Sequence, residues 1–407
     1  MNLVMYAIPF FILLMGVEYA YGRARGRNTY RLADTVNSLS LGTLSRLSGL
    51  VKLGVAGLVF EALRGWTGMA TLPAESWAVW IVAFIGYDFC YYWSHRFGHE
   101  WKLFWASHVA HHQSEEFNLS TALRQTSTGN TFVFYVPLYL LGFPTEMIVT
   151  VGALNLIYQF WVHTEHVPAL GPLEWIFVTP SNHRVHHARN PGYLDRNYGG
   201  VFIVWDRLFG TYTPERADEP CVYGITHPLA SWNPLWANVH VWYETARDTL
   251  RTRRLRDKIK LWFSSPGWRP DDLPPWQDDW QRPKYDPPMT PGAGPLVFVQ
   301  YWIVTVAALA LIVLAADLPR AFVLTGVVVL GYSFFVQGAC LEGRRYATAL
   351  EGIRAVLIAA AAWLWHPLLG TTLTIVVMAY GAVSLLATLR LASLRSEPPA
   401  LWTSGQS

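Results

Sequence analysis

Long apolar runs separated by short polar loops occupy both ends of this chain. The early runs cover residues 3–20, 37–63, 77–93, 132–141 and 146–161. After a polar stretch, four late runs cover residues 296–315, 321–336, 355–369 and 371–389. Most of these runs have the length that a helix needs to cross a bilayer. The pattern predicts an all-α protein, a polytopic membrane helical bundle with about nine spanning helices.

Arginines indicate on which side of the membrane the loops lie. Four of them follow the first run between residues 23 and 31, and Arg344 and Arg345 lie in the middle loop of the late runs. Loops rich in Arg and Lys stay in the cytoplasm. A signal peptide would carry its charge before the apolar run, so we expect the first run to be an uncleaved span. Counting crossings from these loops places residues 95, 163 and 183 at the cytoplasmic face.

The polar stretch between the two sets of runs predicts a lobe outside the membrane. Residues 168–295 are rich in Pro and Trp and contain no apolar run. We expect a catalytic domain over residues 1–295, which combines membrane helices with this lobe, and a region of transmembrane helices over residues 296–407. A basic run at 251–260 has two interpretations, contact with anionic headgroups or a solvated helix face.

Composition supports a membrane protein and excludes other classes. Hydrophobic residues make up 52% of the 407 residues and charged residues only 14%, against about a quarter in soluble domains. The net charge of +3 does not indicate nucleic-acid binding. Cys90, Cys221 and Cys340 lie far apart, which argues against a disulfide framework or an iron–sulfur cluster.

Ten of the thirteen histidines lie between His95 and His187. They form four groups, which are His95 and His99; His108, His111 and His112; His163 and His166; and His183, His186 and His187. Residues three or four apart share one face of a helix, so each group can present its imidazoles together. Neutral imidazole is a good metal ligand, and this many exceed what one ion accepts. We predict a two-metal site, with a change of helix between His99 and His108 because one straight helix would point them apart.

The chemistry of such a site depends on its metal. Two redox-active irons can activate O2 and oxidise an aliphatic C–H bond, whereas zinc would indicate hydrolysis. Apolar surroundings favour oxidation of a membrane lipid. The chain contains neither a G-x-G-x-x-G motif nor a His-Pro-Gly-Gly segment, so we expect a separate electron donor. A metal transporter is the alternative, and it predicts histidines strung through the bilayer rather than gathered at one face.

Carboxylates near the histidines have several interpretations. Asp88 lies seven residues before His95 and so on nearly the same helix face. It is a candidate for holding the second nitrogen of an imidazole, or for a capping role. The other carboxylates near the histidine groups are Glu100, Glu115, Glu116 and Glu165. Each is a candidate metal ligand, a hydrogen-bond acceptor from a ligand, or an exposed acid.

The histidine spacing H-x3-H, H-x2-H-H and H-x2-H-H resembles the fatty acid hydroxylase/sterol desaturase superfamily. Longer strings resemble its alkylglycerol monooxygenase (glyceryl-ether monooxygenase) family. These strings are Tyr92–Glu100, His111–Gln125, Tyr158–Glu165, Pro180–His187 and Trp205–Thr211.

This resemblance implies an O2-dependent non-haem di-iron enzyme, with two irons per chain that zinc can replace on purification. The implied metal ligands are His95, His99, His108, His111, His112, His163, His183, His186 and His187. Glu100 matches an acidic residue of the family, and Glu165 and Asp88 complete our catalytic candidates. The implied reaction hydroxylates the ether-linked carbon of a glyceryl ether and yields a fatty aldehyde and glycerol. A sterol, carotenoid or acyl-lipid hydroxylase or desaturase is the alternative.

Two features depart from the animal members, which use tetrahydrobiopterin as reductant. His166 stands where we expect an apolar residue, so it is a candidate tenth ligand or hydrogen-bond partner. Lysine occurs only at positions 52, 102, 258, 260 and 284 while arginine is abundant. This bias suggests a GC-rich bacterial genome and an inner-membrane location, or the ER membrane for a eukaryotic protein.

Overall fold

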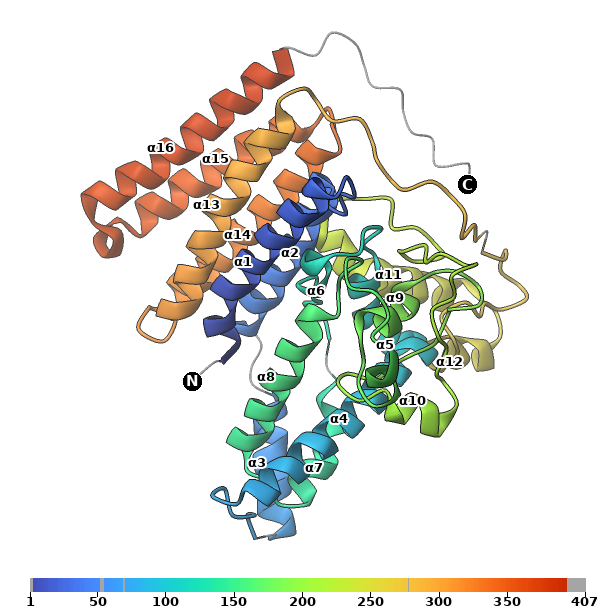
Figure 1. The fold of residues 1–407 in the computed structure, drawn as a ribbon. Coiled ribbons are helices and arrows are strands. Elements are labelled where there is room, and N and C mark those ends of the chain that lie inside the picture. The colour runs from blue at the N-terminus through green and yellow to red at the C-terminus, as the bar shows by residue number, and fades with distance from the viewer. Residues whose placement is uncertain (1–2, 52–54, 69, 130, 277, 394–407) are drawn as a thin grey trace. The chain divides into compact units, whose positions relative to one another are not determined.

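The computed structural model describes residues 3–51, 55–68, 70–129, 131–276 and 278–393 (Figure 1). These residues are all-helical, with no strand and two isolated β-bridges, Phe177 with Phe202 and Ala188 with Tyr223. They form two compact units. The first contains the described parts of Met1–Tyr30, Lys52–Leu229 and Asn238–Arg282, and the second those of Arg31–Val51, Ala230–Ala237 and Pro283–Ser407.

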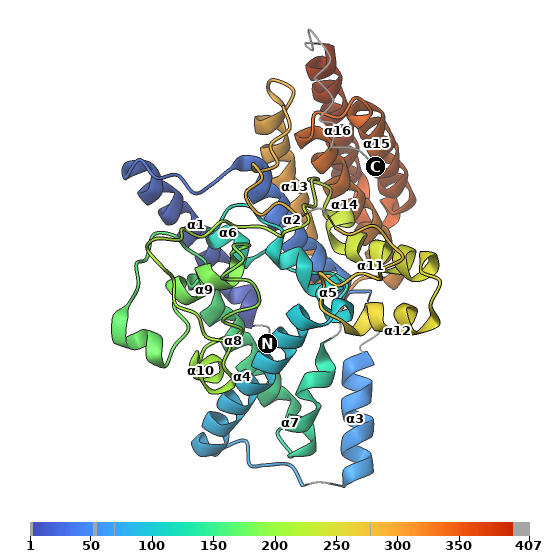
Figure 2. The ribbon, with the colours of Figure 1, turned by 90° about the vertical axis from the view of Figure 1, so that its right-hand side faces the viewer.

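The first unit combines long helices with short helices joined by loops. Its long helices are α1 (Leu3–Ala24), α3 (Val55–Thr67), α4 (Trp77–Glu100), α8 (Thr145–Trp161) and α11 (Pro234–Arg251, from Asn238 onward). Its shorter elements are α5 (Lys102–His112), α6 (Leu119–Ala122), η1 (Phe132–Tyr135), α7 (Val136–Leu140), η2 (Gly171–Trp175), α9 (Pro180–His187), α10 (Val204–Phe209) and α12 (Leu255–Phe263). Helix α4 packs against α5 and α8, and α12 packs against α5 (Figure 2).

The predicted change of helix between His99 and His108 is confirmed. Trp101 has extended backbone angles, φ −118° and ψ 122°, and it separates α4 from α5. The apolar run predicted over residues 77–93 is helical and continues to Glu100. His95 and His99 therefore lie on the last turns of the helix itself.

Local sequence explains where α9 begins. Thr179 and Asn182 form a capping box, in which each side chain bonds to the backbone of the other residue. Pro180 occupies the first turn, where its missing N–H costs no hydrogen bond. The short helix that carries three of the histidines is thus specified by its own first residues.

The second unit is built from α2 (Leu32–Gly49), α13 (Ala293–Leu314), α14 (Arg320–Leu341), α15 (Ala347–Leu364) and α16 (His366–Ser393). Helices α13 to α16 run side by side in Figure 1, and α2 packs against α13 and α14. Gly370 has non-helical angles, φ 72° and ψ 167°, and interrupts α16. It separates the last two predicted apolar runs at the expected position.

Five helices among the described residues are long and apolar enough to cross a membrane, namely α1, α13, α14, α15 and α16. They correspond to the first apolar run and the four late runs. A single helix over residues 37–63 was predicted and is wrong, although residues 52–54 of that range lie outside the described residues. Helix α2 ends at Gly49, where the N–H groups of Leu50 and Val51 bond three residues back and tighten the last turn. Glycine at this point weakens the helix.

Candidate metal centre

Nine of the ten clustered histidines converge inside the first unit. Helix α4 carries His95 and His99, α5 carries His108, His111 and His112, the segment after α8 carries His163, and α9 carries His183, His186 and His187. All of these side chains are buried except those of His108 and His111, which are half-buried. The nine imidazoles divide into two groups of side chains that each could hold a metal ion.

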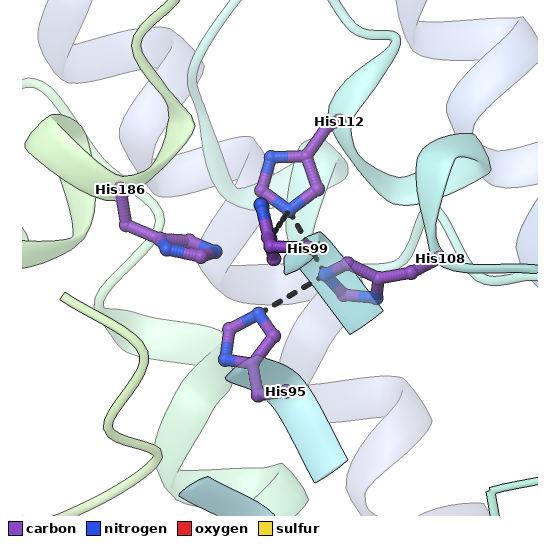
Figure 3. A group of neighbouring side chains, drawn as sticks. All are labelled: His95, His99, His108, His112 and His186. Carbon is purple, nitrogen blue, oxygen red and sulfur yellow. Dashed lines mark hydrogen bonds between the residues drawn. The ribbon is translucent and has the colours of Figure 1, made fainter. Parts of the chain in front are cut away.

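The first group, shown in Figure 3, consists of His95, His99, His108, His112 and His186. Their candidate ligand nitrogens all lie within 4.8 Å of one another. The Nε2 atom of His108 lies 3.0 Å from that of His95 and 3.0 Å from that of His112. Ligand nitrogens about 2.1 Å from one ion lie about 3.0 to 3.4 Å apart in octahedral or tetrahedral geometry. The spacing therefore fits a shared metal ion.

The second group consists of His111, His163, His183 and His187. The Nε2 atom of His163 lies 3.3 Å from that of His111 and 3.0 Å from that of His183. His187 Nε2 lies 3.1 Å from His183 Nε2. The two groups are adjacent, because the rings of His112 and His187 stack with centroids 4.3 Å apart. This arrangement suits two ions held close together.

Backbone carbonyls determine which nitrogen of several imidazoles carries the proton. His111 Nδ1 donates to the carbonyl of Arg124 at 2.8 Å, and His163 Nδ1 donates to that of Gln159 at 2.7 Å. A carbonyl can only accept, so in the neutral rings the two Nε2 atoms that face each other both carry lone pairs. Two such lone pairs repel unless a cation lies between them. The orientation of these rings thus fits a metal.

The same arrangement holds in the first group. His95 Nδ1 donates to the carbonyl of Tyr198 at 2.7 Å, and His186 Nδ1 donates to that of Arg196 at 2.9 Å. The buried Nε2 atom of His186 has no hydrogen-bond partner among the described residues. Imidazoles that bind metals usually donate their other N–H in this way, which fixes ring orientation and tautomer.

Burial keeps these imidazoles neutral, which is the form that binds metal. Burial lowers the pKa of His111 to about 4, helped by the charge of Arg124 and by His99 and opposed by the hydrogen bond to the Arg124 carbonyl. Burial likewise lowers the pKa of His112, His163 and His187 well below its usual value. At neutral pH these rings therefore present nitrogen lone pairs.

His166 lies apart from both groups. Its ring meets that of Tyr21 at 5.4 Å edge to face, and its Nε2 atom lies 3.5 Å from the Thr29 hydroxyl. It also approaches the position where a side chain on Gly22 would be. His166 therefore contacts α1 and the segment after it, and not the other imidazoles.

Asp88 contacts a loop rather than an imidazole, which corrects our expectation that it holds a histidine nitrogen. Its carboxylate accepts hydrogen bonds from the backbone of Val201 at 2.8 Å and of Phe202 at 3.1 Å, and from side chains of Asn155 and Trp205. Asp88 lies on nearly the same face of α4 as His95, but its carboxylate binds the hydrogen-bond donors of the adjacent loop instead. It anchors the segment that follows Tyr198.

Three of the other candidate carboxylates pair with arginines. Glu100 accepts from Arg96 at 2.8 Å, and Glu165 accepts from Arg27 at 2.8 Å. Glu115 is buried and binds Arg282. The backbone of Glu116 bonds to the hydroxyls of Ser114 and Thr121. None of the four belongs to either imidazole group.

Two contributors to the site were missed by sequence reasoning. Asp206 accepts hydrogen bonds from the backbone N–H groups of Tyr198 and Gly199, and so holds the carbonyl that binds His95. The string Trp205–Thr211 contained Asp206, but nothing in its spacing linked it to a histidine. The carbonyls themselves leave no sequence signal, because every residue has one.

Comparison with known proteins identifies the family. The fatty acid hydroxylase pattern matches residues 80–211, which contain all nine imidazoles of the two groups. An alkylglycerol monooxygenase of Danio rerio is 36% identical over 371 residues, which is 86% of this chain and 80% of the relative. The chain belongs to the alkylglycerol monooxygenase family.

Other members of the alkylglycerol monooxygenase family show similar identity. The Homo sapiens protein of that name is 42% identical over 65% of this chain and 59% of its own length. The Xenopus tropicalis protein is 39% identical with the same coverage. No solved structure matches this chain.

Proposed function

We propose that this chain is an integral-membrane monooxygenase that uses O2 to hydroxylate the ether-linked alkyl carbon of an alkylglycerol. The new hydroxyl makes that carbon a hemiacetal, which separates into a fatty aldehyde and glycerol. One oxygen atom enters the lipid, and the other leaves as water after receiving two electrons and two protons from a separate donor. Family membership supports the reaction, and the facing Nε2 atoms of His111 and His163 carry the argument for a metal.

The two imidazole groups are the proposed holders of two iron ions per chain. We assign one ion to His95, His99, His108, His112 and His186, and the other to His111, His163, His183 and His187. Bound iron supplies the redox chemistry that O2 reduction needs, which zinc lacks. The chain orients the ligands through carbonyls such as those of Tyr198 and Gln159, and it buries them away from bulk water. The nine imidazoles lie together at one place, which also argues against a transit path for metals.

Glu100 and Glu165 remain proposed catalytic residues. Asp88 is a proposed positioning residue, because it anchors the segment after Tyr198. Arg96 and Arg27 hold the two glutamates by direct ion pairs. We expect Glu100→Gln and Glu165→Gln to lower turnover while iron content stays at the parental value. Unchanged turnover in either variant would exclude that residue from the reaction.

The membrane arrangement is also a proposal beyond the five long apolar helices. Helix α4 has 24 residues and is about 36 Å long, which exceeds the bilayer core of about 30 Å. We propose that α4 crosses as well, that the other early segments complete about nine spans, and that the imidazoles face the cytoplasm. Arginine usage supports a bacterial inner membrane. Labelling of introduced cysteines from each side of sealed vesicles tests the orientation, and labelling of loop residues 25–31 only from outside intact cells would contradict it.

The reductant is a separate molecule in this proposal. The family resemblance favours tetrahydrobiopterin, and a different donor is the alternative for a bacterial enzyme. Turnover with one and not the other identifies the donor.

The test of the function combines metal analysis with a lipid panel. We expect iron in the purified protein, and aldehyde release from an alkylglycerol that requires O2 and a donor. A sterol, a carotenoid and an acyl lipid serve as comparison substrates for the alternative hydroxylase or desaturase activity. Oxidation of one of these with no cleavage of the ether would overturn the alkylglycerol assignment, and anaerobic turnover would overturn the oxygenase.

A further inference from the structure

Helix α12 and the segment before it concentrate positive charge. Residues 251–263 contain six basic residues and one acidic residue, Asp257. Arg251 ends α11, and α12 begins at Leu255 after an extended Arg254. Arg253, Arg256 and Lys260 are exposed. This surface would attract an anionic partner.

The same helix leaves an apolar stripe uncovered. Leu255, Ile259 and Phe263 follow at intervals of four residues and are 74%, 60% and 50% exposed. Leu261 is fully buried, and it lies on the opposite side of the helix from Ile259, two residues away. A helix of a soluble lobe would turn such a stripe inward. Here the part of the chain that the structure describes covers only the face that carries Leu261.

Charge and stripe occupy neighbouring positions on the helix. Arg256 and Lys260 each follow a stripe residue by one position, so they form a basic edge along it. A stripe of large apolar residues bordered by Arg and Lys is the pattern of helices that lie in the plane of a membrane interface. A symmetric contact with a second copy would instead bring two basic edges together, which repel.

Contacts within the first unit place α12 at the end of α4. The Phe263 ring meets that of Trp101, the residue after α4, edge to face at 5.7 Å. The backbone N–H of Lys102 donates to the carbonyl of Ser264 at 2.9 Å. At the other end of α4, Trp77 is 75% exposed. Aromatic residues at both ends of a helix about 36 Å long are typical of a span between two interfaces.

We propose that α12 lies in the headgroup layer of an anionic bilayer, with Leu255, Ile259 and Phe263 at the acyl boundary and Arg256 and Lys260 on lipid phosphates. This contact holds the lobe that carries the imidazoles against the membrane surface. It goes beyond the proposed reaction and rests on the proposed crossing by α4, so it is independent of metal identity and substrate.

The test measures the depth of α12 in the full-length, iron-loaded protein. Ile259→Cys is labelled with an environment-sensitive fluorophore in a Cys221→Ala background, because Cys90 and Cys340 are buried. The protein is reconstituted into vesicles of phosphatidylcholine alone or with about 30% phosphatidylglycerol, each with a nitroxide-labelled lipid as quencher. Asp218→Cys, labelled in the same way, is the control on an exposed loop.

The expected result is blue-shifted emission at position 259 and quenching at least about twofold stronger than at position 218, greatest in anionic vesicles. Arg256→Glu with Lys260→Glu should reduce that quenching while iron content stays unchanged. Water-like emission at position 259 in both vesicles would overturn the proposal. Equal quenching in neutral and anionic vesicles would overturn the assignment to anionic headgroups. Crosslinking of position 259 to a second copy, with the label shielded from the quencher lipid, would show that protein and not lipid covers α12.

Discussion

The carboxylate of Asp206 accepts a hydrogen bond from the backbone N–H of Tyr198 at 2.7 Å. The carbonyl of Tyr198 in turn accepts from Nδ1 of His95, at 2.7 Å. A buried acid that contacts no imidazole thus fixes the backbone that orients one. Thr211 and Gly199 donate to the same carboxylate, which leaves Asp206 with three donors to satisfy.

Replacing Asp206 by Asn should weaken both the fold and the metal site. The amide nitrogen of Asn would face an N–H or hydroxyl donor, so one buried donor loses its acceptor. We expect unfolding free energy to fall by about 1–3 kcal/mol and iron affinity to fall about 10–100-fold. Denaturant titration and iron binding by competition measure the two effects. Asp218→Asn, at an exposed ion pair with Arg216, is the matched control, and equal effects of the two variants would contradict the role of Asp206.

Stability should also carry a pH dependence from Asp206. Burial raises the pKa of this carboxyl to about 6, and its three hydrogen bonds oppose but do not cancel that effect. The folded state therefore holds this proton between about pH 4 and pH 6, where the unfolded chain has released it. The contribution of Asp206 to stability is largest below that window and falls as pH rises through it, by at most about 3 kcal/mol.

The comparison that isolates this contribution uses the metal-free protein, so that iron release does not interfere. Unfolding free energies of the parent and of Asp206→Asn are measured from about pH 4 to pH 7. The unfolding free energy of the parent should exceed that of Asp206→Asn by less and less as the pH rises across this range. A difference that grows with pH would mean that the folded carboxyl has a lowered pKa.

Substitution of His111 by Ala should abolish O2-dependent lipid turnover and lower iron content, while the protein still inserts into the membrane. His111 is a member of the second imidazole group, and its ring is held by the carbonyl of Arg124. His166→Ala is the matched control, because that histidine lies outside both groups against Tyr21. Retained turnover in His111→Ala would remove His111 from the site.

Removal of metal should destabilise the protein, and zinc should restore stability without activity. Metal that binds the folded state alone adds its binding free energy to stability. Without it, the facing nitrogen lone pairs of His111 and His163 are uncompensated. We expect a chelator to lower Tm, added zinc to recover Tm, and only iron to recover turnover. Full activity with zinc would exclude redox chemistry.

Gly200→Ala should perturb the site by steric crowding alone. A Cβ atom at this position would lie 2.8 Å from Cδ1 of Tyr91, 2.9 Å from a carboxylate oxygen of Asp88 and 3.0 Å from Asn155 Oδ1. These atoms belong to the anchor of the loop after Tyr198. We expect about 1–3 kcal/mol of destabilisation and reduced iron content. Gly267→Ala is the control, because no atom lies within 4 Å of the position of its Cβ. A similar loss of stability and iron in the two variants would show that crowding at Gly200 has no specific effect.

Local signals in the sequence determined much of this protein. Apolar runs of sufficient length predicted α1 and the four late helices, and the boundary between the last two runs falls at Gly370, which interrupts α16. The thirteen-residue separation of His95 and His108 required the change of helix that occurs at Trp101. These features depend on residues close in the chain. The single helix predicted over 37–63 was wrong because α2 ends at Gly49, a residue that weakens a helix, and the prediction continued the helix past it.

Tertiary packing alone decided how the histidines are shared. His111 and His112 are consecutive, as are His186 and His187, yet the members of each pair belong to different groups. Consecutive residues on a helix point about 100° apart, so spacing predicts that neighbours diverge but not which distant imidazoles they meet. That choice depends on how α4, α5 and α9 are placed against one another. The same packing directs Asp88 to a loop and Asp206 to the backbone behind His95. The sequence could not predict these contacts, because every residue has backbone groups and hydrogen bonds to them leave no pattern of side chains.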